Sequence, residues 1–268
     1  MPSVGRLRYL EALPSGAAAA RPRGVLVLLH AFPLNARMWE DQLVMAERGW
    51  RVLVPQFRGF DTVSVEPAVS SMDDYAGDII DLLDALHIKQ AVISGLSMGG
   101  YVAFAMLRLA ARYIHALILA DTKPQADTPD AVAARRRMLE MLEAKGASAI
   151  ADEMLPKLLG DTTLAARPQI VDQVRSLVLA NASDGIAGAI RALISRQDSV
   201  PLLASIHVPT LIIVGDEDRV TPRPLSEAMQ QAIPGSELVV IGGAGHLSNL
   251  EQPAAFNLAL TRFLDHRV

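Results

Sequence analysis

Residues 91–100 of the chain read AVISGLSMGG, an apolar run that ends in a glycine-rich turn. The run at residues 91–94 is unbroken by charge and is typical of a strand buried on both faces. A helical pattern follows, so the stretch predicts a strand, a sharp turn and a helix. Such a turn lifts the Ser97 hydroxyl clear of the sheet and places it at a helix N-terminus, where free N–H groups favour developing negative charge. Ser97 is therefore our candidate nucleophile.

An ordinary glycine-rich turn is the alternative interpretation of Gly95-Leu96-Ser97-Met98-Gly99, since a bare Gly-x-Ser-x-Gly often arises by chance. The glycines favour a nucleophile, because a serine held in a strained turn needs neighbours without bulk. A P-loop is excluded because no Gly-Lys-Ser/Thr follows, and a dinucleotide fingerprint because the Gly-x-Gly-x-x-Gly spacing is absent here.

Other short apolar runs alternate with helical patterns along the chain. The runs lie at residues 25–29, 51–54, 116–120, 210–214 and 237–241. A helix is expected at residues 72–86, where apolar residues recur at spacings of three and four after a cap at Ser71 or Asp73. Before them we expect a hairpin at residues 5–13 and a turn at 17–20. Strands that alternate with helices predict an α/β fold with a mainly parallel sheet covered on both faces.

One segment interrupts this alternation. Residues 122–203 contain helical patterns at 131–144, 147–159, 169–180 and 185–195, and no convincing strand. We therefore predict an α/β core formed by residues 1–121 and 204–268, with residues 122–203 inserted as a helical lid. The lid contains no Phe, Trp or Tyr, so the pocket walls that it supplies should be aliphatic.

A serine nucleophile needs a base within hydrogen-bond reach. Of six histidines, His246 stands in a loop of small residues, Gly242-Gly243-Ala244-Gly245-His246, after the last predicted strand. Such a loop lies at the carboxyl edge of the sheet, where ligands bind in open α/β folds. His246 is the predicted base. The alternative is a histidine that merely belongs to the loop before a helix.

A third group must orient the base. Gly215-Asp216-Glu217-Asp218 follows a predicted strand and offers three carboxylates. Asp121, at the end of the strand before the lid, is a serious competitor because it lies at the same edge. Either assignment gives the chain order Ser, Asp, His.

A developing oxyanion needs two backbone donors directed at one point. Met98, immediately after Ser97, is expected to supply one. Phe32, in His30-Ala31-Phe32-Pro33 after an early predicted strand, is the natural second. For His30 itself we favour a buried histidine bonded to backbone over a catalytic role.

Together these motifs resemble the α/β-hydrolase superfamily over essentially the whole chain, and most closely its small esterases and 3-oxoadipate enol-lactonase-like members. The matching elements, in chain order, are His30-Ala31-Phe32-Pro33-Leu34 with Met38-Trp39, Arg58-Gly59, Gly95-Leu96-Ser97-Met98-Gly99-Gly100, Gly215-Asp216-Glu217-Asp218 with Thr221-Pro222, and Gly243-Ala244-Gly245-His246 with Glu251-Gln252-Pro253.

The resemblance implies an α/β-hydrolase fold with a helical lid. It also implies that Asp218 is the acid and that Phe32 and Met98 form an oxyanion hole, and it implies no metal or organic cofactor. The chain departs from the family at Ala31, where glycine is usual, and at Gln56, where aspartate is frequent. We expect both departures to tune the site rather than abolish it.

The substrate pocket is the least determined feature. We expect Trp39, Met138, Met141 and Met154 to line it, since methionine adapts to irregular apolar ligands. Arg135-Arg136-Arg137 could recognise a substrate carboxylate. However, consecutive helical residues point in different directions, so a solvated face is the favoured interpretation.

Composition limits the partners. The formal charge is −4, which gives no basic footprint for nucleic acid and no polybasic membrane patch. The absence of cysteine excludes disulfide and thiolate chemistry. The first residues lack a signal-peptide pattern, so we expect a cytoplasmic protein. The oligomeric state is left open.

The leading hypothesis is hydrolysis of carboxylic esters with small to medium aliphatic acyl groups. Enol-lactone hydrolysis, and acyl transfer including perhydrolysis, could use the same residues. A dehalogenase is disfavoured because it would need aspartate at position 97. A binding protein built on this fold is the alternative from another class, but such proteins commonly lose a member of the triad, and none is missing here.

Overall fold

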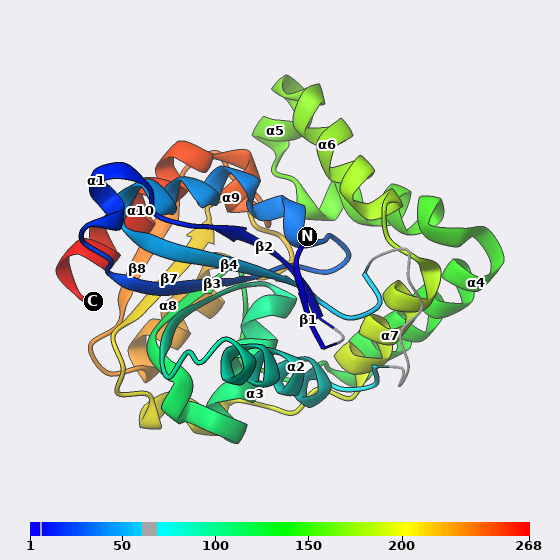
Figure 1. Ribbon diagram of the computed structural model, residues 1–268. Coiled ribbons are helices and arrows are strands. Elements are labelled where there is room, and N and C mark those ends of the chain that lie inside the picture. The colour runs from blue at the N-terminus through cyan, green and yellow to red at the C-terminus, as the bar shows by residue number, and fades with distance from the viewer. Residues whose placement is uncertain (6, 61–68) are drawn as a thin grey trace.

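An eight-stranded sheet lies at the centre of the fold (Figure 1). The computed structural model describes residues 1–5, 7–60 and 69–268. The strands are β1 (Ser3–Val4), β2 (Leu7–Ala12), β3 (Gly24–Leu29), β4 (Trp50–Gln56), β5 (Ala91–Leu96), β6 (Ile114–Ala120), β7 (Thr210–Gly215) and β8 (Glu237–Ile241). Their order across the sheet is β1-β2-β4-β3-β5-β6-β7-β8. Every apolar run expected to form a strand does so.

The sheet is parallel from β4 to β8, and the opening hairpin joins it antiparallel at β4. In the register, Leu26 of β3 stands between Val52 of β4 and Val92 of β5. These three side chains are at most 1% exposed. Continuous apolar runs suit such central strands because helices cover both faces of the sheet.

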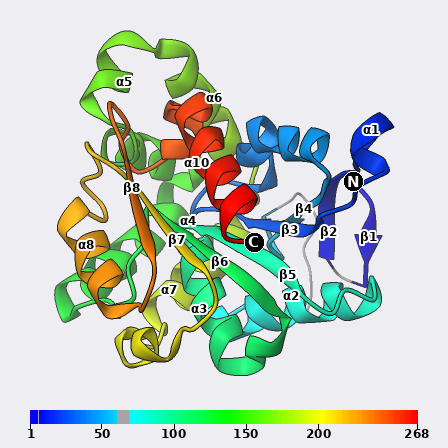
Figure 2. The same ribbon diagram turned by 90° about the vertical axis from the view of Figure 1, so that its left-hand side faces the viewer.

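Helices cover the two faces as the alternation predicts (Figures 1 and 2). One face carries α2 (Met72–Ala85), α3 (Met98–Ala110) and α8 (Arg223–Ala232), and the other carries the 3-10 helix η1 (Ala36–Arg48), α9 (Ser248–Glu251) and α10 (Pro253–His266). The cap of α2 is Ser71, whose hydroxyl accepts from the N–H of Asp74 while the Asp74 carboxylate accepts from the N–H of Ser71. This reciprocal pair stabilises the start of the helix.

Two local predictions were wrong or incomplete. Residues 17–19 of the expected turn at 17–20 belong instead to the one-turn helix α1 (Gly16–Ala19), because a run of alanines favours helix when nothing breaks it. The long 3-10 helix η1 was not predicted. Its N-cap Asn35 accepts from the N–H of Arg37, and Gly49 ends it with a left-handed φ of 92°.

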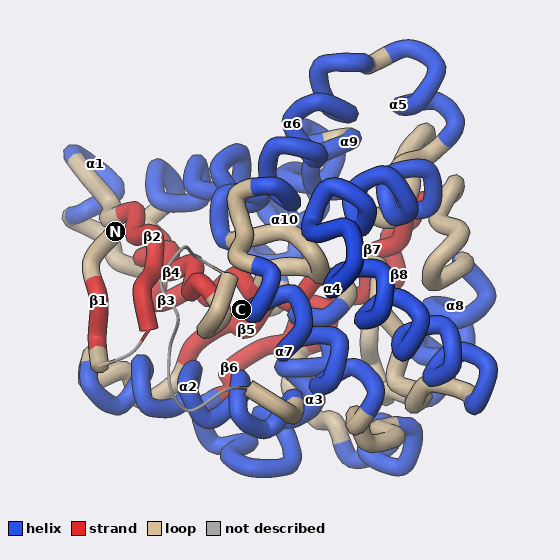
Figure 3. Tube along the Cα trace, turned by 90° about the vertical axis from the view of Figure 1, so that its right-hand side faces the viewer, coloured by secondary structure: helices blue, strands red, loops and turns tan. Residues whose placement is uncertain are grey.

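A helical segment follows β6 and precedes β7 (Figure 3). It contains α4 (Pro129–Leu158), α5 (Asp161–Ala166), α6 (Pro168–Leu179), α7 (Ser183–Ile194) and η3 (Val200–Ser205), and residues 122–203 hold no strand. Gly146, with φ of 73°, breaks α4 between the two helices expected there, and α5 was not foreseen. Among the described residues, no single helix is long and apolar enough to span a bilayer. The helices α6 and α7, which are bent by 93° relative to one another, reach that length and apolar composition only when they are taken together.

Candidate active site

A chain of hydrogen bonds joins Ser97, His246 and Asp218. The Ser97 hydroxyl lies 2.7 Å from Nε2 of His246, and Nδ1 of His246 lies 2.8 Å from Oδ2 of Asp218. The three residues follow β5, β8 and β7, so they meet at the carboxyl edge of the sheet. All three are buried. The geometry places Asp218, rather than Asp121, against the imidazole.

Ser97 has the strained backbone expected for its turn. Its φ of 55° and ψ of −112° lie where residues other than glycine are rare. The flanking glycines are sterically required. A Cβ on Gly95 would lie 2.3 Å from the carbonyl carbon of Gly99, and a Cβ on Gly99 would lie 2.1 Å from the carbonyl oxygen of Leu29. The backbone can therefore form this tight turn only with glycine at positions 95 and 99.

Asp218 is held as a carboxylate by four donors. Its Oδ1 accepts from the N–H groups of Val220 and Thr221, and its Oδ2 accepts from the Thr221 hydroxyl as well as from His246. Burial alone raises the pKa of Asp218, but the His246 charge and these hydrogen bonds outweigh it and lower the pKa below its ordinary value. Asp218 thus carries the negative charge beside the imidazole.

Asp121 has a different role in the fold. Its carboxylate accepts from the N–H of Gly215 at 2.9 Å and from the hydroxyl of Ser248, and no hydrogen bond joins it to His246 within the described chain. Burial and the nearby charge of Asp218 raise the pKa of Asp121 well above its ordinary value. Asp121 therefore fastens together the loops that carry Asp218 and His246.

The basicity of His246 is set by opposing effects. Complete burial lowers its pKa, while the Asp218 charge and hydrogen bond raise it, with contributions of the same sign from Asp121 and Glu251. The net result is a pKa above the ordinary 6.5. The imidazole can therefore accept a proton from Ser97 and hold it beside Asp218.

Phe32 and Met98 lie beside the serine, as expected, and both line the cavity into which it opens. Neither of their N–H groups donates a hydrogen bond to another described residue. His30 is fully buried, and its Nε2 accepts from the N–H of Phe57 while Nδ1 binds the carbonyl of Ala31. The prediction of a structural histidine at position 30 is confirmed.

The two departures from the family pattern are accommodated in this loop region. Ala31 is fully buried, and its N–H donates to the sulfur of Met38 at 3.2 Å. Gln56 accepts from the N–H of Ala36 at 2.9 Å and donates to the carbonyl of Phe60. Both residues thus brace the loops beside the serine.

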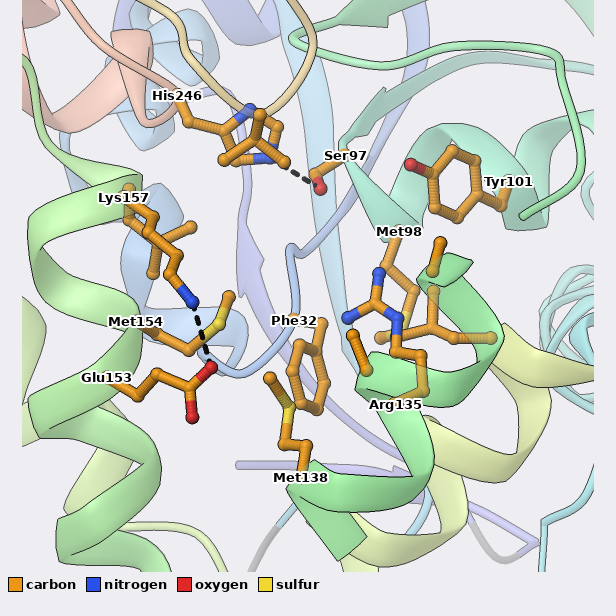
Figure 4. A pocket seen from close by; sticks show the side chains of 15 residues that line it. Phe32, Ser97, Met98, Tyr101, Arg135, Met138, Glu153, Met154, Lys157 and His246 are labelled. Carbon is orange, nitrogen blue, oxygen red and sulfur yellow. Dashed lines mark hydrogen bonds and ion pairs between the residues drawn. The ribbon is translucent and has the colours of Figure 1, made fainter. Parts of the chain in front are cut away.

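A cavity of about 230 Å³ opens above Ser97 and His246 (Figure 4). It is lined by Phe32, Ser97, Met98, Tyr101, Ala131, Ala134, Arg135, Met138, Glu153, Met154, Lys157, Leu158, Leu193, Val220 and His246. Met138 and Met154 lie there as expected.

Two expected pocket residues do not line this cavity. Trp39 is fully buried and packs against Phe256, with ring centroids 5.8 Å apart, because η1 directs it toward α10 instead. Met141 lies nearly one turn beyond Met138 on α4, where it is half-buried and packs against the hydrophobic core. Both assignments are corrected.

The cavity also contains charged and polar residues that the sequence analysis did not place there. Arg135 projects into it, whereas Arg136 and Arg137 are exposed, so the solvated-face interpretation holds for two of the three arginines. Tyr101 was missed, although it stands one helical turn after Ser97. Glu153 and Lys157, one turn apart on α4, form an ion pair on the opposite wall.

Comparisons with known proteins agree with this arrangement. The model of the alpha/beta hydrolase family matches residues 26–259. The chain is 32% identical to 3-oxoadipate enol-lactonase 1 of Acinetobacter baylyi, over 86% of this chain and 85% of that protein.

Two solved structures are similar over nearly the whole chain. One is a thermophilic esterase from Thermogutta terrifontis with malate bound, which has a TM-score of 0.89, 36% identity and coverage of 97% of this chain and 93% of the other. The second is the enol-lactonase of Burkholderia xenovorans, with a TM-score of 0.87, 25% identity and coverage of 97% and 96%. The chain therefore belongs to the α/β-hydrolase family.

Proposed function

We propose that this protein is a serine hydrolase that cleaves carboxylic esters of small to medium aliphatic acids through an acyl-enzyme. The observation that carries the proposal is the hydrogen-bonded chain from Ser97 through His246 to Asp218, which opens directly into a mainly apolar cavity. We propose in addition that residues 122–203 act as a lid, since Met138, Met154 and Leu193 from this segment form cavity walls.

In the proposed reaction, Ser97 Oγ attacks the ester carbonyl while its proton passes to Nε2 of His246. Asp218 holds Nδ1–H and stabilises the imidazolium that forms. The N–H groups of Phe32 and Met98 bind the oxyanion of the tetrahedral intermediate. His246 then protonates the departing alcohol, and the acyl group stays on Ser97.

Water completes the cycle. His246 removes a proton from a water molecule that attacks the acyl carbonyl, and the collapse of the second tetrahedral intermediate returns the proton to Ser97 Oγ. The products are a carboxylic acid and a free alcohol. At the end of each turnover Ser97 and His246 have regained their starting bonds and protons.

The cavity supports short to medium acyl chains. Its aliphatic walls, which include Ala131, Ala134, Met138 and Leu193, gain about 0.8 kcal/mol for each methylene that they bury. Preference should therefore rise gradually along a series of acyl chains and stop where the volume of about 230 Å³ is filled.

Hydrolysis of an enol-lactone that carries a carboxylate is the second candidate, and Arg135 favours it. Its Nε donates to Asp127, and its guanidinium lies 5.9 Å from the ring of Phe32, inside the cavity. Asp127 is shared with Arg196 at 2.7 Å, so two cations meet one buried carboxylate. Relatives named as enol-lactonases, and a similar esterase with malate bound, are consistent with a substrate that carries an acid group.

The experiment that tests the proposal combines labelling with substitution. A fluorophosphonate should label the wild type at Ser97, and Ser97→Ala should lower ester hydrolysis by about 10⁶-fold because the triad acts as a unit. Ser183→Ala, at an exposed serine on α7, is the matched control and should retain activity. Labelling at another residue, or an active Ser97→Ala variant, would contradict the proposal.

A further inference from the structure

Glu251, on the short helix α9, carries a carboxylate that the reaction above does not use. The residue is fully buried, and no ion pair involves its side chain in the part of the chain described. A buried charge without a cation needs strong hydrogen bonds instead. Three backbone groups supply them. The Glu251 carboxylate accepts from the N–H groups of Gly245 at 2.9 Å, Leu247 at 3.2 Å and Gly160 at 2.9 Å.

The partners show which form of the carboxyl group fits. A protonated acid would present an O–H that needs an acceptor, whereas a carboxylate only accepts. Every partner of the Glu251 side chain among the described residues is a donor, so the ionised form fits this site. Amide bonds to a charged acceptor are among the stronger hydrogen bonds in proteins.

These bonds fix the backbone on both sides of His246. The N–H groups of Gly245 and Leu247 bind Glu251, and that of His246 binds the carbonyl of Leu158 at 2.9 Å. The N–H of Ser248 points to Asp121 at 3.4 Å. The four consecutive N–H groups of residues 245–248 thus donate to Glu251, Leu158 or Asp121, and none of these acceptors lies within residues 245–248.

The same carboxylate reaches across to the helical segment. Its Oε2 binds Gly160, just after α4 ends, and Leu158 on that segment holds the amide of His246. The two backbones approach so closely that a Cβ on Gly245 would lie 2.3 Å from the nitrogen of Gly160. The end of α4, whose Met154 and Leu158 line the cavity, is therefore joined directly to the turn that carries the base.

We propose that Glu251 is a positioning residue for His246, which holds the base turn and the end of α4 in one hydrogen-bonded unit. The inference rests on the proposed role of His246 as the base. Through this unit, a substrate that contacts α4 in the cavity acts on the same backbone that sets the distance from His246 to Ser97. A shift of about 1 Å at such a site can cost about a hundredfold in rate.

The charge of Glu251 gives the proposal a second readout. Among the charges near His246, Asp218 on the loop after β7, Asp121 after β6 and Glu251 on α9 each raise its pKa, against the effect of burial. The cavity that His246 faces also holds Arg135, Glu153 and Lys157 of α4. Removal of the Glu251 charge should therefore lower the pKa of His246. If Glu251 had only a structural role, its replacement by a neutral side chain would leave this pKa unchanged.

The test is Glu251→Gln, which keeps the size of the side chain and removes its charge. Glu217→Gln is the matched control. Glu217 also anchors the helical segment, through the N–H and hydroxyl of Thr162, but among the described residues its carboxylate makes no hydrogen bond to the turn of His246. Thermal unfolding and circular dichroism establish that each variant is folded. The measurements are kcat, KM and the pH dependence of kcat/KM on an aryl ester.

We expect Glu251→Gln to lower kcat by about tenfold to a hundredfold with little change in KM. The acidic limb of kcat/KM should move to lower pH, and Glu217→Gln should stay close to wild type in both respects. An unchanged kcat and acidic limb in folded Glu251→Gln, or an equal loss in Glu217→Gln, would overturn the proposal. Should Glu251→Gln not fold, Leu158→Gly at the end of α4 and Gly160→Ala just after it perturb the same backbone while the Glu251 charge stays in place. A wild-type kcat in both folded variants would then overturn the proposal.

Fluorophosphonate labelling of the wild type separates this proposal from the proposed function. If Ser97 is not labelled, the serine hydrolase proposal fails. If Ser97 is labelled, but at the same rate and with the same pH dependence in Glu251→Gln, only the role of Glu251 fails.

Discussion

Ser97 Oγ and His246 Nε2 lie 2.7 Å apart, although 149 positions separate the two residues in the chain. Parallel strands bring them together because the carboxyl ends of β5 and β8 lie at one edge of the sheet. The backbone around each residue holds this distance. Ser97 has a strained, positive φ, and Gly245, next to His246, is closely packed against Leu159 and Gly160. The reactive geometry is therefore a property of the fold as a whole.

The acid can be identified by a pair of isosteric variants. Asp218→Asn should lower kcat by about 10⁴-fold, because the amide favours the wrong tautomer of His246. Asp121→Asn should cost far less, since its side chain binds Gly215 and Ser248 rather than the imidazole. Steady-state kinetics on one ester, with both variants shown to be folded, make the comparison. A larger loss in Asp121→Asn would assign the acid to the end of β6.

The pH dependence of kcat/KM should report the base. His246 must be neutral to accept the proton of Ser97, and its pKa is raised above 6.5 because Asp218 outweighs burial. Activity should therefore rise with pH through a midpoint above 6.5 and be lost below it. A profile measured with a substrate that does not ionise checks this. A midpoint below 6.5 would show that burial dominates.

Substitution of Arg135 should show whether the substrate is neutral or anionic. If the substrate carries a carboxylate, Arg135→Ala should lower kcat/KM on an anionic lactone by at least about a hundredfold and leave a neutral ester nearly unaffected. Arg136→Ala and Arg137→Ala are controls on the same helix, because both side chains are exposed. Near-wild-type rates of Arg135→Ala on both substrates would leave the neutral-ester hypothesis standing.

His30 should make the stability of the fold depend on pH. Burial lowers its pKa to about 3 in the folded protein, while the unfolded chain protonates near 6.5. The unfolded state thus gains the proton first, and the free energy of unfolding should fall by about 2 kcal/mol between pH 7 and pH 5 from this residue. In folded His30→Gln this dependence should be weaker, whereas the exposed control His207→Gln should behave like wild type. Urea unfolding at several pH values measures the free energy of unfolding. If this free energy varies equally with pH in the wild type and in both variants, His30 is not the cause.

The sequence by itself determined the order of the strands along the chain, the turn at Ser97 and the base at His246. These features depend on local spacing: apolar runs, glycines that must flank a strained serine, and small residues before a loop histidine. The acid was less determined, because Asp121 and Asp218 both follow parallel strands. Only the resemblance to a family favoured Asp218 before the hydrogen bonds of the folded chain were seen.

The tertiary structure decided which side chains face the cavity. Arg135, Arg136 and Arg137 are equivalent by composition, but the docking of α4 turns only Arg135 inward. Trp39 was expected in the pocket and lies instead in the core, because the 3-10 helix that carries it could not be read from apolar periodicity. Contacts that join distant segments, such as Glu251 with Gly160, depend on the packing of the complete fold and leave no signal in local sequence.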